Sequence, residues 1–307
     1  MTEPHITILM ATFNGARFLQ AQLDSLVAQT HGNWSLIVSD DGSQDATLDI
    51  LQDFGRAYPG RNLQLVQGPC QGAAAQNFMS LLMRADLPSG VVALADQDDV
   101  WLPQKLARAV DHLQKVPQNQ PAIYASESTP TDAGLVPLRQ RGQSTARPSF
   151  RNALVQNLFA GHTTVLNAAA LAIVQAAGTP QNIPFHDWWL YQLIAGAGGA
   201  CLLDSAQTVL YRQHCDNSFG AARGVTGVLN RARHLLRNDY SGWLSAHWQA
   251  LQGAAPHLAP DARDLMHDLM HRPMDERRAA QFRRLGLHRG TAQGTVALWL
   301  AASLGRA

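Results

Sequence analysis

The sequence has few of the features that mark secreted, zinc-binding or membrane-spanning proteins. Its three cysteines, Cys70, Cys201 and Cys215, are odd in number, widely spaced and not in any CxxC pair, which argues against a disulfide framework or a zinc site. No uncharged apolar run approaches the ~20 residues that a bilayer span needs. No basic stretch precedes a long apolar run at the N-terminus, so we expect no signal peptide. These absences predict a cytoplasmic protein that is soluble or peripheral at the inner face of the membrane.

Charged residues are also scarce. They make up 15% of the 307 residues, against 46% apolar residues, a composition typical of a globular chain with a large core. The net charge of +1 gives no electrostatic case for nucleic acid as a partner. The charge is uneven, because residues 1–222 hold 12 Lys+Arg and 17 Asp+Glu whereas residues 223–307 hold 12 Arg and 6 acids. The tail is therefore basic.

Apolar runs rich in β-branched residues alternate with segments whose apolar residues recur at helical spacing. Strands are expected at 6–11, 34–39, 63–67, 91–95 and 208–211, and helices at 17–29, 45–54 and 73–85. This alternation predicts an α/β fold with a mostly parallel sheet and helices on both faces. Residues 125–150 are rich in Ser, Thr, Pro and Gly, which predicts a mobile surface loop. That loop is either an insertion that becomes ordered when a ligand binds or a solvated linker with no role.

Carboxylates follow two of these strands directly. Asp96, Asp98 and Asp99 come after the run at 91–95, and another acidic pair follows the strand at 34–39. Parallel strands deliver their carboxyl ends to one edge of a sheet, where open sheets bind ligands. Repulsion between such acids is offset by a hard cation, such as Mg²⁺ or Mn²⁺ on a substrate diphosphate. The alternative is an acidic turn that solubilises the end of a strand.

Three blocks of sequence carry a family resemblance. ITILMATFNGARFL, VSDDGSQDAT and ALADQDDVWLPQKL resemble the motifs of family 2 glycosyltransferases of the GT-A fold, and are most similar to those of rhamnosyltransferase-like members. The similarity continues through GHTTVLN, HDWWL and YRQHCDN, and so covers roughly residues 5–220. It implies a Rossmann-like GT-A catalytic domain at 1–222. The rest of the chain, 223–307, lies outside the resemblance, and we expect it to form a helical C-terminal extension.

The resemblance places the donor nucleotide beside the first two strands. Thr12, Phe13 and Asn14 fall where the family cradles the base, and an aromatic ring can stack on a base. Core packing is the alternative for Phe13. Asp40 and Asp41 match the acidic pair with which the family reads a pyrimidine, while turn chemistry is their alternative role. Which acid reads the base is left open.

The metal and the diphosphate are implied at the DxD element and at the closing motif. Asp96 matches the family's acid that binds the ribose and the metal, and Asp98 matches the acid that binds the metal. Asp99 is expected to be a supporting acid beside them. His214 matches the residue that completes the metal shell, and Arg212 the one that meets the diphosphate. The implied cofactor is Mn²⁺ or Mg²⁺, which stabilises the charge on a departing nucleoside diphosphate.

Asp187 is the candidate general base, since it stands where the family has a carboxylate before an apolar helix. A helix N-cap is its alternative role. His186 replaces a common acidic residue there, and Trp188 and Trp189 are candidates for an acceptor platform, although at least one is expected in the core. Further acceptor-side residues are implied at Gly161, His162 and Thr163.

The basic tail has a helical pattern. Helices are expected at 228–238, 240–251, 262–271, 276–285 and 295–304. The last is only about half of a membrane span, but it follows five arginines. It therefore suits peripheral contact with an anionic membrane surface. Docking on the protein's own core, or on a second copy in a homodimer, is the alternative.

The resemblance implies an inverting, metal-dependent glycosyltransferase that moves a single sugar from a UDP- or dTDP-linked donor to a glycan or lipid-linked acceptor in cell-surface polysaccharide synthesis. Two alternatives remain. A sugar-nucleotide pyrophosphorylase is disfavoured because the loop TFNGARF is not Gly-rich in the manner of a phosphate loop. A non-catalytic nucleotide-sugar-binding module is disfavoured by the acids at 96, 98 and 187. Processive synthesis is not expected, because QFRRL at 281–285 lacks the tryptophan of a QxxRW element.

Overall fold

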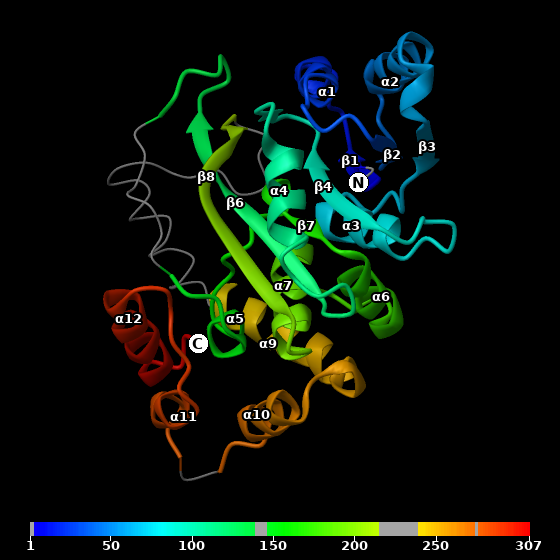
Figure 1. The fold of residues 1–307 in the computed structure, drawn as a ribbon. Helices are drawn as coiled ribbons and strands as arrows, with labels where there is room; N and C mark the ends of the chain where they lie inside the picture. Colours follow the sequence, from blue (N-terminus) through cyan, green and yellow to red (C-terminus); the bar gives the residue numbers. More distant parts are fainter. Residues whose placement is uncertain (1–2, 139–145, 215–238, 274–275) are drawn as a thin grey trace.

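The computed structural model describes residues 3–138, 146–214, 239–273 and 276–307. In this part of the chain the centre is a mixed sheet of eight strands, in the order β3-β2-β1-β4-β7-β6-β8-β5 (Figure 1). The strands are β1 (Ile6–Thr12), β2 (Trp34–Asp40), β3 (Leu63–Gln67), β4 (Val91–Asp96), β5 (Val100–Trp101), β6 (Ala122–Thr131), β7 (Val165–Leu166) and β8 (Ala200–Arg212).

The first half of the sheet is parallel, as the alternation of strands and helices predicts. β1 pairs in parallel with β2 and β4, and β2 with β3. The short β7 runs antiparallel between β4 and β6, and β5 runs antiparallel to β8. The long strands β6 and β8 pair in parallel. The predicted α/β architecture with a mostly parallel, mixed sheet is confirmed.

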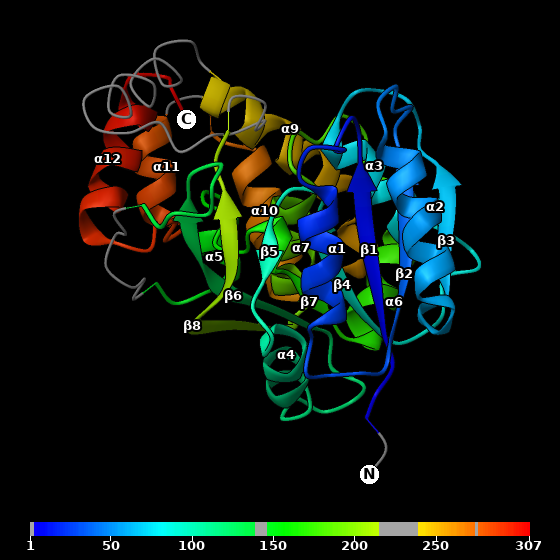
Figure 2. The same ribbon diagram turned by 90° about the horizontal axis from the view of Figure 1, so that it is seen from above.

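Helices cover both faces of this sheet (Figure 2). Alternate residues of β1 point to opposite sides, so Ile8 and Met10 join one buried cluster and Leu9 joins the other. The first cluster includes residues of α1 (Leu19–Val27), α2 (Thr47–Ala57) and α4 (Lys105–Leu113). The second includes residues of α3 (Ala74–Leu82), α6 (Ala168–Ala177) and α7 (His186–Gly196).

The C-terminal part is helical, as predicted. It contains α9 (Asp239–Gly253), α10 (Pro260–Met270), α11 (Arg278–Arg284) and α12 (Ala292–Ser303), while the predicted helix at 228–238 lies outside the described residues. Trp248 and Phe282 belong to the same buried cluster as α7, and Trp248 Nε1 donates to the carbonyl of Leu154 at 2.8 Å. These helices therefore pack on the same core as one face of the sheet. In the described ranges, none of the helices combines the length and apolar character of a membrane span.

The prediction of a loop over the whole of 125–150 is wrong for its first part. β6 continues to Thr131, which is fully buried. The hydroxyl groups that suggested a loop pair instead with β8: Thr129 Oγ1 donates to Gln207 at 2.8 Å, and the Ser126 and Thr208 hydroxyls lie 2.5 Å apart. Residues 139–145 lie outside the described chain, and a short helix, α5 (Phe150–Ala153), follows.

Candidate active site

The carboxyl ends of β1, β2 and β4 meet at one edge of the sheet. In the strand register Thr12 is opposite Asp40, and Ala11 is opposite Asp96. Neighbouring strands lie about 4.8 Å apart, so the two acids flank the end of β1 at nearly the same level. The sequence predicted this convergence from the position of the acids after their strands.

Asp40 and Asp41 each organise a different loop. Asp40 Oδ1 accepts hydrogen bonds from Thr12 Oγ1 at 2.9 Å and from Ser43 Oγ at 2.5 Å. Asp41 Oδ1 accepts from the Cys70 amide at 2.6 Å, across to the loop after β3. Both acids are buried. Both acids therefore stabilise loops, which is the alternative role predicted for them. These contacts do not distinguish which of the two would bind the nucleotide base.

The loop after β1 is braced on both sides. Asn14 has a left-handed φ of 47°; its amide donates to Ser43 Oγ and its side-chain oxygen accepts from the Gln44 amide, both at 2.8 Å. Gln97 exchanges two 2.9 Å hydrogen bonds with the backbone of Phe13. The ring of Phe13 is 48% exposed, which excludes core packing as its role. A fixed backbone thus presents an open aromatic ring beside the two acids.

The end of β8 docks on the acidic turn after β4. His214 Nε2 lies 2.7 Å from Asp98 Oδ2, and Arg212 Nε donates to the Asp98 carbonyl at 2.8 Å. The Arg212 guanidinium also lies over the Phe18 ring, 4.5 Å from its centroid. The structure thus brings Asp98 together with Arg212 and His214, which lie 114 and 116 residues later in the sequence.

Asp96 and Asp187 belong to the same electrostatic group. Burial, together with the negative charges of Asp98 and Asp187, raises the pKa of Asp96 to about 7. Asp187 lies at the start of α7, where its Oδ2 accepts from the Gly161 amide at 2.9 Å. The carboxylates of Asp98, in the turn after β4, and of Asp187, on α7, are therefore close enough to raise the proton affinity of Asp96.

Lys105 is a neighbour of this group that the sequence reasoning missed. It is fully buried at the start of α4, with Nζ 3.9 Å from the centroid of the Trp101 ring. Burial lowers the pKa of Lys105 to about 7, against the opposing charge of Asp99. Asp99 is itself buried, which with Asp96 and Asp98 raises its pKa well above the usual range. The sequence signal that could have identified Lys105 is its position on the apolar side of the helix α4.

Asp96 also belongs to a cluster of atoms that could bind a metal ion. Ligand atoms of Asp96, Asp99 and His162 lie within 4.8 Å of one another. Burial, reinforced by the Lys105 charge, lowers the pKa of His162 to about 3, so its imidazole is neutral. Its ring stacks on Tyr211 at a centroid distance of 4.6 Å. Asp96 thus lies in a compact cluster with Asp99 and His162, whereas its link to Asp98 is electrostatic and Asp98 itself contacts His214.

The predicted acceptor-side residues Gly161, His162 and Thr163 form a buried 3₁₀ turn. A Cβ on Gly161 would lie 2.9 Å from His186 Nε2, so only glycine lets this turn approach α7 so closely. The His186 ring stacks on Phe78 at 4.2 Å, and burial lowers the pKa of His186 despite the opposing charge of Asp187. The turn and the neutral histidine therefore support the Asp187 carboxylate.

Trp188 and Trp189 correct the expectation of an acceptor platform. Their exposed fractions are 5% and 1%, because α7 lies within the core rather than along a cleft. Trp188 Nε1 donates to the Ala153 carbonyl at 2.7 Å, and its ring lies 4.7 Å from that of His247 on α9. Both indoles are therefore core residues, with no ring face open to a sugar.

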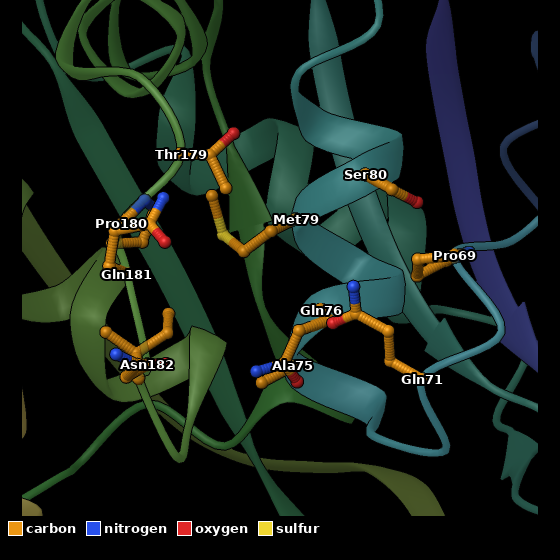
Figure 3. Close-up of a pocket in the computed structure, with 11 residues that line it drawn as sticks. Pro69, Gln71, Ala75, Gln76, Met79, Ser80, Thr179, Pro180, Gln181 and Asn182 are labelled. Atoms are coloured by element: carbon orange, nitrogen blue, oxygen red, sulfur yellow. The ribbon is translucent and has the colours of Figure 1, made fainter.

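A cavity of about 280 Å³ lies beside these elements (Figure 3). It is formed by the loop after β3, the first turns of α3 and the segment before α7. Its lining includes the amide side chains of Gln71, Gln76, Gln181 and Asn182 and has no charged residue. The cavity adjoins the loop bound by Asp41 and the segment leading to Asp187, but it contains none of the predicted site residues.

A known protein family matches the part of the chain that includes β1, β2, β4 and the acidic turn after β4. The model of Glycosyl transferase family 2 matches residues 7–170, more than half of the chain. The chain belongs to glycosyltransferase family 2. This glycosyltransferase is 30% identical over 237 residues to the dTDP-rhamnosyl transferase RfbG of Shigella flexneri, covering 75% of this chain and 80% of that protein. The resemblance seen in the sequence is thereby confirmed.

Solved structures of glycosyltransferases share the fold. TarS 1-349 of S. aureus in complex with UDP-GlcNAc aligns with a TM-score of 0.57 at 13% identity, over 98% of this chain and 89% of that one. The mannosyltransferase PcManGT of Pyrobaculum calidifontis, in complex with GDP-Man and Mn²⁺, aligns with a TM-score of 0.53 at 18% identity, over 100% of this chain and 88% of that one. At these identities the likeness concerns the fold, which is the predicted GT-A fold.

Proposed function

We propose that this glycosyltransferase moves a single sugar, with inversion and with a divalent cation, from a nucleoside-diphosphate sugar to a hydroxyl of a glycan or lipid-linked acceptor in cell-surface polysaccharide synthesis. The observation that carries the proposal is the electrostatic group of Asp96, Asp98 and Asp187, which joins the donor side to the candidate base. The name of RfbG, a dTDP-rhamnosyl transferase, and the UDP-GlcNAc bound to TarS support a dTDP- or UDP-linked donor.

The donor base is assigned to the end of β1. The open ring of Phe13 offers a stacking surface, and a carboxylate of Asp40 or Asp41 is the acceptor for a pyrimidine N–H. Thr12 and Asn14 fix the end of β1 against the end of β2. Thr12 Oγ1 donates to Asp40, and the Asn14 amide donates to Ser43 Oγ. The Arg212 guanidinium beside Asp98 is assigned to the diphosphate.

The cation is assigned to Asp98 and His214, with Asp96 as a further ligand. Carboxylate oxygens and a neutral imidazole nitrogen suit Mn²⁺, and the carboxylates suit Mg²⁺. A cation there would offset the repulsion among the three acids and, when bound, would stabilise negative charge on the departing diphosphate. The set with Asp99 and His162 is less suited, because burial and the charges of Asp96 and Asp98 raise the pKa of Asp99 well above its usual range, and a cation binds only the ionised carboxylate.

Asp187 is assigned as the general base that removes the proton of the acceptor hydroxyl. Its two oxygens accept from the amides of Gly161 at 2.9 Å and Trp188 at 2.7 Å, which fixes the plane of the carboxylate. A base held in this way can take a proton as the acceptor oxygen attacks the anomeric carbon. Attack opposite the departing diphosphate inverts the configuration of that carbon.

Thermal unfolding with a panel of nucleotide sugars tests this function. We expect a UDP- or dTDP-sugar at hundredfold excess over Kd to stabilise the protein by about 2.7 kcal/mol, and to raise Tm by several degrees only when Mn²⁺ is present. Release of the nucleoside diphosphate should follow when an acceptor glycan is added. Absence of any shift, or a shift that EDTA leaves unchanged, would contradict the proposal. Binding without turnover would instead indicate a non-catalytic nucleotide-sugar-binding module.

Cation binding should depend on pH through Asp96. Because the pKa of Asp96 is raised to about 7, this group holds a proton below that pH, and a cation binds only the ionised form. Mn²⁺ affinity should therefore fall by up to about tenfold per pH unit below 7 and level off above it. Calorimetric titration between about pH 5.5 and 8 measures this, and Asp96→Asn should flatten the profile. A wild-type affinity that does not change with pH would show that Asp96 is not a ligand.

A further inference from the structure

The C-terminal helix α12 is apolar on two opposite sides. Leu298 and Ala302 are 2% and 3% exposed and pack into the core. Val296, Leu300 and Leu304 are 50%, 61% and 76% exposed. These three residues are spaced by four, so they share one side of the helix. Three large aliphatic side chains in one row on a surface helix indicate a docking surface rather than scattered exposure.

Arginine side chains lie close to this row, and of these Arg284 is paired with Asp268 and Glu276. α12 itself contains no charged residue, and residues 277–307 contain six arginines and no Asp or Glu. Arg277 and Arg283 are exposed, and the Arg283 guanidinium lies 4.8 Å from the centroid of the Trp299 ring on α12. The surface is therefore an apolar row next to cationic side chains. α12 lies at the rim of the molecule in both ribbon views (Figures 1 and 2).

We propose that α12 lies in the interface of an anionic lipid bilayer. The row of Val296, Leu300 and Leu304 enters the boundary between head groups and acyl chains, and the flanking arginines meet lipid phosphates. Twelve residues of helix are about 18 Å long, too short to cross a hydrocarbon layer of about 30 Å. The helix therefore lies along the surface of the bilayer.

A second copy of the chain fits this surface less well. The exposed side of one helix about 18 Å long offers far less than the ~800 Å² per partner of a stable interface. In a two-fold dimer the same patch meets itself, so the arginines of one copy would face those of the other. An anionic bilayer instead supplies both an apolar layer and the opposite charge.

Co-sedimentation of the full chain with lipid vesicles tests the proposal. We expect the protein to pellet with phosphatidylcholine vesicles that contain about one quarter phosphatidylglycerol, and to remain in the supernatant with phosphatidylcholine alone. Leu300→Asp should lower the partition coefficient at least about tenfold. Val136→Asp is the matched control, because Val136 is 59% exposed outside α12 and the change in charge is the same. This control should bind like the wild type.

Three outcomes would overturn the proposal: no binding of the wild type to anionic vesicles, equal binding of Leu300→Asp and wild type, or an equal loss in Val136→Asp. Light scattering that finds a dimer broken by Leu300→Asp, with vesicle binding unchanged, would assign the surface to a second copy instead. An unchanged Tm establishes that each variant is folded. The assay uses no nucleotide sugar, so its failure would leave the proposed function untouched.

Discussion

Replacement of Asp187 by Asn should slow sugar transfer by about a thousandfold, within the range of general-base contributions, and leave donor affinity within about threefold of wild type. Asn cannot accept the proton of the acceptor hydroxyl. It keeps one oxygen for the amide of Gly161 or Trp188, so the start of α7 should hold its position. Release of nucleoside diphosphate in the presence of acceptor measures the rate, and calorimetry measures donor affinity.

Asp111→Asn is the matched control for this variant, because Asp111 is an exposed carboxylate on α4. It should have wild-type turnover. An Asp187→Asn variant with normal turnover would remove Asp187 from the chemistry. A variant that loses donor binding and turnover together would assign Asp187 to the donor site instead.

The second large effect is expected at Asp98. Asp98→Asn should abolish the Mn²⁺-dependent part of donor binding and reduce transfer to background, because an amide oxygen is a poor substitute for a carboxylate ligand. The neutral side chain has nearly the same shape and can still bond to His214, so the fold should be retained. Thermal unfolding with a nucleotide sugar, in Mn²⁺ and in EDTA, measures the loss.

Asp99→Asn distinguishes the proposed cation site at Asp98 and His214 from the cluster of Asp96, Asp99 and His162. If the cation is held by Asp98 and His214, Asp99→Asn keeps the Mn²⁺-dependent stabilisation and Asp98→Asn loses it. The opposite pattern would move the cation to the set of Asp99 and His162. Equal responses in both variants and the wild type would contradict a metal site at this turn.

The sequence predicted the parts of the fold that depend on local pattern. Strands at 6–11, 34–39 and 91–95 were recognisable because they are buried on both faces and read as continuous apolar runs. The convergence of Asp40 and Asp96 followed from parallel strand direction alone. β6 was missed because its hydroxyl side chains pair with those of β8, and composition does not reveal a partner that lies about 80 residues away.

The site was predictable where it follows a strand and not where it depends on packing. Lys105 was missed because a lysine is usually solvated, whereas here it lies buried against Trp101 and near Asp99. Trp188 and Trp189 were candidates for an acceptor surface, with at least one expected in the core, because no local pattern tells which helix is surrounded on all sides. Only tertiary contacts with α9 and the sheet decide that.

The central claim is that a single carboxylate drives a single displacement opposite a cation-bound diphosphate. Proton NMR of the sugar transferred by the wild-type enzyme tests it most directly, because the coupling at the anomeric carbon reports configuration. One displacement predicts that the product has the opposite anomeric configuration to the nucleotide sugar. A product with retained configuration would contradict the assignment of Asp187 as the base in a single step.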